Sequence, residues 1–101
     1  MTMDLAGFRQ SLDAPAPPTF ASLALQGLWW DGKGDWDQAH RCAQDQDDAP
    51  GAAVHAYLHR KEGDPANARY WYARAGRRPV DGALEDEWTA LVCELLAAEP
   101  P

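Results

Sequence analysis

The stretch VHAYLHRKEGDPANARYWYA, from Val54 to Ala73, repeats the pattern of LQGLWWDGKGDWDQAHRCAQ, from Leu25 to Gln44. Each copy has an apolar-rich segment, a Gly-Asp break, and a second segment with alanine four residues after the aspartate. The breaks, Gly34-Asp35 and Gly63-Asp64, lie 29 positions apart. A period of this length is typical of stacked supersecondary units. The repeat therefore predicts two helical hairpins.

Each break has the chemistry of a tight turn between helices. Glycine adopts the left-handed conformation that ends many helices, and aspartate is a favoured N-cap for the helix that follows. Pro65 fits the first position of a helix, where its missing N–H costs nothing. We expect a helix to end at each glycine and another to begin at each aspartate.

The remaining chain divides around the two hairpins, and no segment has the pattern of a strand. We predict one all-α domain, residues 1–101, forming a right-handed stack. It has an N-terminal arm and proline-rich tether over 1–18, with a short helix at about 3–12. Hairpin 1 covers 19–47, with Thr19 as the candidate N-cap of its first helix, and hairpin 2 covers 50–78. An acidic linker over 45–51 joins them, and a capping helix covers 81–98. We expect the arm to be only lightly attached to the body.

Composition restricts the class of protein. The net charge is −7, which argues against general binding of nucleic acid or anionic membranes, because phosphate neutralisation requires excess cations. Cys42 and Cys93 form no metal-binding or disulfide pattern, and we expect both to be buried thiols. The sequence has no recognisable secretory signal and no apolar run of about 18–20 residues. We predict a cytoplasmic protein.

Residues of the second copy resemble a known repeat. The pattern of Gly63-Asp64, Ala68, Tyr72, Ala75 and Pro79 is similar to the second half of a tetratricopeptide (TPR) repeat. The first copy matches through Gly34-Asp35-Trp36, Ala39 and Pro50. The first helix of each unit departs from that family, and the period is shorter than usual. The resemblance implies a TPR-like architecture. The stretch HAYLHRKEGDPANARYWYARAG also resembles a motif of small uncharacterised proteins, which implies a fold and no reaction.

Two histidines give the chain a candidate metal site. His55 and His59 lie one helical turn apart, so both imidazoles can reach one point, and Glu62 joins the same stripe. His40, on the other hairpin, is the candidate third ligand. Ala56 stands where the HExxH motif requires glutamate, so the general base of that motif is missing. The alternative is that both histidines are core residues satisfied by hydrogen bonds or by stacking on tryptophan.

The aromatic residues suggest a partner surface. Most of them, including Trp29, Trp71, Tyr72 and Trp88, are expected in the core. Tyr70, together with Trp30 or Trp36, is expected on faces that the core leaves open. We predict a surface for a protein partner or a second copy of the chain, formed largely by the first helices of the two hairpins. Its residues are Trp30, His55, His59, Glu62 and Tyr70.

Four arginines near the end of hairpin 2 form a candidate anion site: Arg69, Arg74, Arg77 and Arg78. The alternative is that they complement a helix C-terminus. No residue pattern predicts a catalytic site or a cofactor, although a metal ion is possible at His55, His59 and Glu62. The leading prediction is therefore a non-catalytic interaction or self-association module. The alternative is a metal- or small-ligand-binding protein, conceivably an enzyme.

Overall fold

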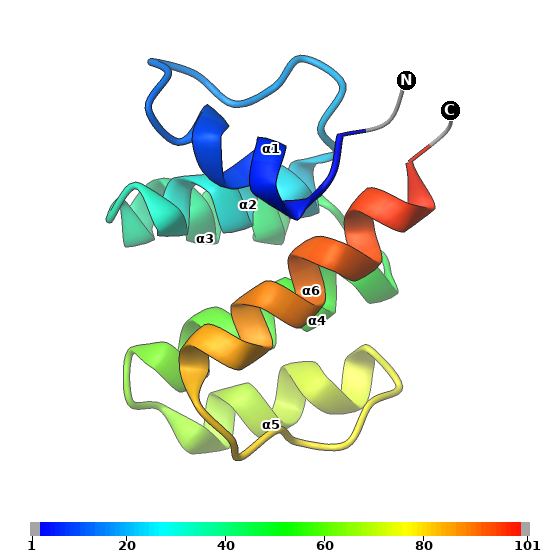
Figure 1. Ribbon diagram of the computed structural model, residues 1–101. Helices are drawn as coiled ribbons and strands as arrows, with labels where there is room; N and C mark the ends of the chain where they lie inside the picture. Colours follow the sequence, from blue (N-terminus) through cyan, green and yellow to red (C-terminus); the bar gives the residue numbers. More distant parts are fainter. Residues whose placement is uncertain (1–2, 100–101) are drawn as a thin grey trace.

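Six helices make up the part of the chain that the structure describes, residues 3–99 of a computed structural model (Figure 1). No strand occurs in this part, so the all-α prediction is confirmed. The helices are α1 (Leu5–Ser11), α2 (Leu23–Gly32), α3 (Trp36–Asp45), α4 (Ala49–Lys61), α5 (Pro65–Arg74) and α6 (Leu84–Ala98).

The turns of the two hairpins, α2–α3 and α4–α5, have nearly the same geometry. Gly34 has a φ of 86° and Gly63 a φ of 87°, a conformation that residues with a Cβ rarely adopt. The Asp35 carboxylate accepts the Gln38 N–H at 3.1 Å, and the Asp64 carboxylate accepts the Asn67 N–H at 3.1 Å. The predicted turns are therefore confirmed.

The starts of α2 and α4 differ from the prediction. Ser22, not Thr19, caps α2, since its hydroxyl accepts the Leu25 N–H at 3.2 Å. Helix α4 begins inside the segment that we assigned as a linker, because Asp48 caps it and Pro50 lies in its first turn, where proline is tolerated. Gly51 is required there, since a Cβ would collide with the Gln46 carbonyl.

Helix α6 packs across α1, α2 and α4, and Figure 1 shows it running in front of α4. Leu91, Val92 and Leu95 of α6 are buried in the main core. The Trp88 indole N–H donates to the Leu28 carbonyl at 2.9 Å. We predicted that α6 only caps one end of the molecule. It also covers α2 and α4, the first helices of the two hairpins.

The arm is not lightly attached. Phe8 of α1 has no exposed surface and packs against Trp88, with ring centroids 6.0 Å apart. The Trp29 indole N–H donates to the Ser11 hydroxyl at 3.1 Å, and the Lys33 ammonium donates to the Leu12 carbonyl at 2.6 Å. Burial of one aromatic ring and these bonds anchor α1 on α2 and α6, which the proline-rich composition did not predict.

A buried carboxylate, Asp31, joins hairpin 1 to hairpin 2. It accepts the Tyr57 hydroxyl at 2.7 Å and the Lys61 ammonium at 2.8 Å. Burial and the hydrogen bond to Asp31 raise the pKa of Tyr57 well above its ordinary value, so this hydroxyl remains a donor. The pairing compensates for taking the carboxylate out of water.

A second buried carboxylate, Glu87, joins hairpin 2 to α6. It accepts the Tyr72 hydroxyl at 2.5 Å and the Arg60 guanidinium at 2.9 Å. Burial raises the pKa of Tyr72, and the hydrogen bond to Glu87 raises it further. The two carboxylates therefore tie α4, which is buried along most of its length, to elements on either side of it.

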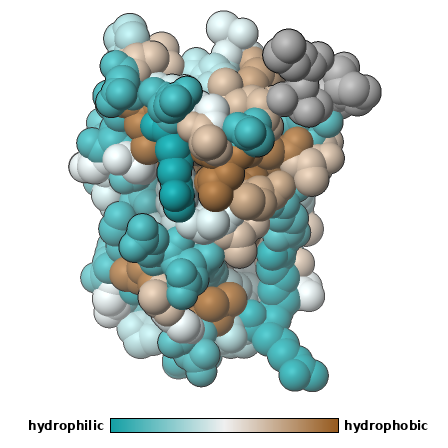
Figure 2. All heavy atoms as spheres, viewed as in Figure 1, coloured by the Kyte–Doolittle hydropathy of each residue, from teal (hydrophilic) through white to brown (hydrophobic). Residues whose placement is uncertain are grey.

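Apolar side chains gather on the surface where α1 meets α6 (Figure 2). Here Met3, Leu5, Cys93 and Leu96 line a groove of about 370 Å³. Cys93 is exposed and Cys42 is half-buried, so the prediction of two buried thiols was wrong. None of the helices in residues 3–99 combines the length and apolarity that a membrane crossing requires.

Candidate metal centre

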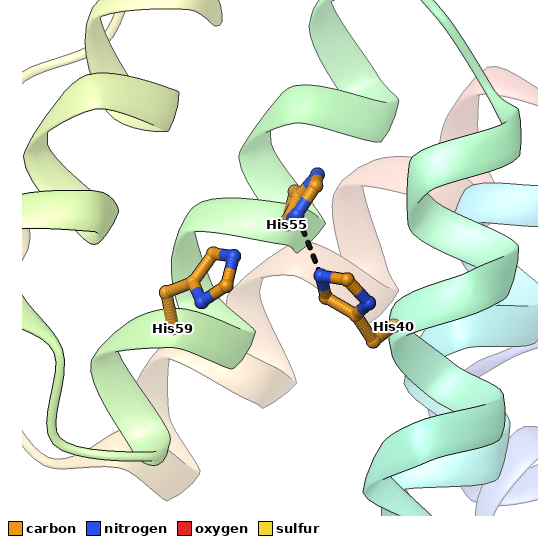
Figure 3. Close-up of side chains that lie close together, drawn as sticks. All are labelled: His40, His55 and His59. Atoms are coloured by element: carbon orange, nitrogen blue, oxygen red, sulfur yellow. Dashed lines mark hydrogen bonds between the residues drawn. The ribbon is translucent and has the colours of Figure 1, made fainter.

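Three histidines from the two hairpins meet between α3 and α4 (Figure 3). Helix α4 carries His55 and His59 one turn apart, and α3 carries His40. The Nε2 atoms of His55 and His40 lie 2.9 Å apart, and the ligand atoms of all three rings lie within 4.8 Å of one another. His55 and His59 are only 4% and 6% exposed, whereas His40 is half-buried and faces solvent in part.

Two tryptophans hold the rings in place. Trp71 of α5 stacks on His55 with a centroid distance of 3.8 Å, and Trp36 of α3 stacks on His40 at 4.9 Å. The Trp36 indole N–H also donates to the Leu58 carbonyl at 2.9 Å, which fixes Trp36 against α4. The orientation of the imidazoles is thus determined by packing from both hairpins.

Glu62 determines the hydrogen position on His59. Its carboxylate oxygen lies 2.6 Å from Nδ1 of His59, and a carboxylate can only accept. Nδ1 therefore carries the hydrogen in the neutral ring, and Nε2 is left with its lone pair. Figure 3 shows the His59 ring directed toward the other two. A carboxylate bonded to the far nitrogen of an imidazole is the usual support of a metal-ligating histidine.

Burial favours the neutral form of His55 and His40. Burial lowers the pKa of His55 to about 4, with further contributions from the charges of His40 and His59. Burial also lowers the pKa of His40, and the charge of His59 lowers it further. Neutral imidazoles bind a metal ion without first losing a proton. With both rings neutral, the contact between the Nε2 atoms of His40 and His55 is a hydrogen bond, so one of these atoms carries a hydrogen that must move to Nδ1 before both can bind an ion.

The spacing suits a small tetrahedral ion. With Zn–N bonds of about 2.0–2.1 Å, two ligand nitrogens of a tetrahedral site lie about 3.3 Å apart. The Nε2 atoms of His40 and His55, at 2.9 Å, lie closer together than this, so the two rings must move apart to hold one ion. Three imidazoles leave a fourth position for water or another ligand. The set could hold zinc or another first-row divalent ion.

The structure divides the predicted metal set between two groups. His40, the candidate third ligand, meets His55 and His59, whereas Glu62 groups with His59 and Asp64 and lies against Nδ1 of His59. Sequence reasoning offered stacking on a tryptophan as the alternative to metal binding, but it did not identify Trp36 or Trp71 as the stacking residues, and it missed the proximity of Asp64. Asp64 lies two residues after Glu62, and this spacing could have indicated a shared site. We explained Asp64 by its role as an N-cap instead.

The residues of the predicted partner surface do not form one exposed face. His55 and His59 are buried, Trp30 is half-buried edge-on against Trp29, and Tyr70 on α5 is 52% exposed. Helix α6 packs on α2 and α4, the helices that we expected to carry this surface. Of the set, Tyr70 and Glu62 are the exposed members.

The four arginines of the candidate anion site point to different elements. Arg77 pairs through both terminal nitrogens with Glu94 of α6. Arg74 lies 3.6 Å from Asp47 and donates to the Tyr70 hydroxyl at 3.2 Å. Arg69 lines a separate pocket beside Pro79, and Arg78 is exposed. Two of the four are thus already paired with carboxylates of the chain.

Comparisons of the chain with protein-family models, with curated proteins and with solved structures found no match.

Proposed function

We propose that this protein binds a divalent transition-metal ion of the zinc class through Nε2 of His40, His55 and His59. One observation carries the proposal. The chain has three histidines in 101 residues, and the ligand atoms of all three lie within 4.8 Å of one another. They come from two hairpins, so helical spacing alone does not account for their meeting.

The packing around the rings also supports metal binding. His40 and His55 already form a hydrogen-bonded pair through their Nε2 atoms. Here a third ring lies beside the pair, and burial followed by the neighbouring rings lowers the pKa of His55 and His40. A metal ion bound to all three rings would replace the hydrogen bond between His40 and His55. The Glu62 carboxylate then increases the basicity of His59 as a ligand.

The ion would connect the two hairpins. His40 belongs to hairpin 1, and His55 and His59 belong to hairpin 2, within what we propose to be a TPR-like right-handed stack. An ion that binds the folded chain and not the unfolded chain stabilises the fold, by about 2.7 kcal/mol at a free concentration of 100 Kd. Metal binding would therefore raise the thermal midpoint of the protein.

A competition titration tests the proposal. The apoprotein is titrated with Zn²⁺ in the presence of a chromophoric chelator, beside the His40→Ala variant. Arg41→Ala is the matched control, because Arg41 is the exposed neighbour of His40 on α3. We expect sub-micromolar binding in the wild type and the control, and a large loss in His40→Ala. Binding no tighter than about micromolar in the wild type would overturn the proposal.

Self-association or capture of a protein partner through Tyr70 is a second candidate function. It is favoured by the 52% exposure of this aromatic side chain, which packs edge-on against Trp71 at 5.2 Å. Light scattering coupled to size-exclusion chromatography tests self-association. We expect a dimer that Tyr70→Ser dissociates and that His55→Ala/His59→Ala leaves intact. A wild-type protein that stays monomeric at high concentration would contradict the self-association form.

A further inference from the structure

A second set of metal ligands shares His59 with the first. His59, Glu62 and Asp64 have ligand atoms within 4.8 Å of one another. Glu62 is exposed and Asp64 is half-buried, so this outer set is open to a hydrated ion. His59 is the only one of the three that is buried.

We infer that a second divalent ion binds to Nδ1 of His59 together with the carboxylates of Glu62 and Asp64, and that His59 bridges the two ions. This inference rests on the proposed function. The two nitrogens of the His59 ring point in different directions. Nδ1 lies 2.6 Å from the Glu62 carboxylate, whereas the opposite side of the ring is directed toward His40 and His55 (Figure 3). One imidazole therefore belongs to both ligand sets.

The turn at Gly63 brings the Glu62 and Asp64 carboxylates close together, but the turn itself does not require a carboxylate at position 62. Gly63, with a φ of 87°, reverses the chain between Glu62 and Asp64. Asp64 uses its Oδ1 to cap α5, and its other carboxylate oxygen remains for a ligand. The corresponding turn of hairpin 1 has the same glycine conformation and the same cap, but Lys33 stands at the position of Glu62. A carboxylate at this position is therefore not a requirement of the turn.

Binding of the second ion at the outer site releases one proton. In the metal-free ring, the hydrogen on Nδ1 is shared with Glu62. The second ion takes the place of this proton, which passes to solvent, and His59 becomes a bridging imidazolate between two cations. A mixed set of one nitrogen and two carboxylates suits Zn²⁺ or Cu²⁺ rather than Ca²⁺ or Mg²⁺, which prefer oxygen ligands throughout.

Stoichiometry tests the outer site. Zn²⁺ binding is measured by native mass spectrometry and calorimetry for the wild type, Asp64→Asn and Glu62→Gln. Asparagine keeps an N-cap acceptor at position 64, so the variant retains its helix cap. Asp35→Asn, at the equivalent cap of hairpin 1, is the matched control. We expect two ions per chain in the wild type and Asp35→Asn, and one ion in Asp64→Asn and Glu62→Gln.

The outcomes separate the two claims. No bound ion in the wild type overturns the proposed function. One ion in the wild type overturns the outer site and leaves the three-histidine site standing. Two ions in the wild type and in both outer variants overturns the assignment to Glu62 and Asp64. The bridge itself is tested with Cu²⁺, where magnetic coupling weakens the paramagnetic resonance signal of the doubly loaded wild type. A signal of full intensity for two ions overturns the shared ligand.

Discussion

The two hairpins have the same turn but carry different side chains around it. Gly34 and Gly63 share one conformation, Asp35 and Asp64 cap the next helix in the same way, and Ala39 and Ala68 are both buried. These are the positions that the fold requires, and they are duplicated. The residues of the proposed metal site are not duplicated. Positions equivalent to His55, His59 and Glu62 carry Gln26, Trp30 and Lys33.

The difference assigns separate tasks to the two hairpins. Around the first turn, Lys33 donates to carbonyls of Leu12 and Ala14 and so holds the N-terminal arm. Around the second turn, Glu62 supports His59. If the proposed metal site is correct, one backbone geometry serves attachment in hairpin 1 and ligand binding in hairpin 2. Each prediction below tests this division.

The largest effect is expected from removing a ligand of hairpin 2. His59→Ala takes away one imidazole and the ring that Glu62 orients. We expect the Zn²⁺ affinity to fall by more than about 100-fold. That is the largest loss usually seen when only a residue hydrogen-bonded to a metal ligand is removed. Trp30→Ala, at the equivalent position of hairpin 1, is expected to leave the affinity within a few-fold of the wild type. Competition with a chelator measures both, and equal losses would contradict the division of tasks.

Acid is expected to destabilise the metal-free protein through hairpin 2. The pKa of His55 is lowered from 6.5 to about 4 in the folded state, so the unfolded chain binds more protons between these values. Stability is complete above about pH 6.5 and is lost as pH falls toward 4. The expected loss is up to about 3 kcal/mol, at about 1.4 kcal/mol for each pKa unit.

Denaturant unfolding at several pH values, in the presence of a chelator, measures this dependence. His55→Gln should flatten the curve between pH 6.5 and 4, with the part due to His40 remaining, because burial lowers its pKa as well. A wild-type stability that is constant over this range would contradict the burial of a neutral His55.

Loss of the carboxylate that orients His59 is expected to have a smaller effect. Glu62→Gln should weaken binding of the first Zn²⁺ ion by about 10–100-fold, the usual range for a supporting partner. Lys33→Gln, at the equivalent position, should leave the metal affinity unchanged and weaken attachment of α1 instead. Zn²⁺ affinity and hydrogen exchange in α1 measure the two effects. An unchanged affinity in Glu62→Gln would show that the carboxylate does not support the ligand.

The smallest effect is expected to be the same in both hairpins. Gly34→Ala and Gly63→Ala each place a Cβ in a left-handed conformation with open space around it. Each should lower the free energy of unfolding of the metal-free protein by about 1–2 kcal/mol. Thermal or denaturant unfolding measures the pair. A clearly unequal cost would contradict the equivalence of the two turns.

The turns were predictable from the sequence because their requirements are local. Gly34 and Gly63 satisfy a backbone conformation, and Asp35 and Asp64 satisfy free N–H groups of the next helix. The start of α4 was not predictable in the same way, since proline and glycine at positions 50 and 51 usually mark a loop. Here Asp48 caps the helix, and the Gln46 carbonyl leaves no room for a side chain at Gly51.

The site was partly predictable for a similar reason. His55, His59 and Glu62 share one helical stripe, so their proximity follows from the helical period. His40 was only a candidate, because its approach depends on how α3 packs on α4. The positions of Trp36 and Trp71, and the docking of α1 through Phe8, depend on contacts between elements far apart in the chain. No local pattern encodes such contacts.

Nuclear magnetic resonance of the three imidazoles, recorded while one equivalent of Zn²⁺ is added, tests the central claim most directly. The chain contains three histidines, so each ring gives a resolved set of nitrogen signals. We predict that the Nε2 signals of His40, His55 and His59 all move together and that the change is complete at one equivalent. Nε2 signals that stay in place, or a shift confined to a single ring, would contradict a metal site shared by the two hairpins.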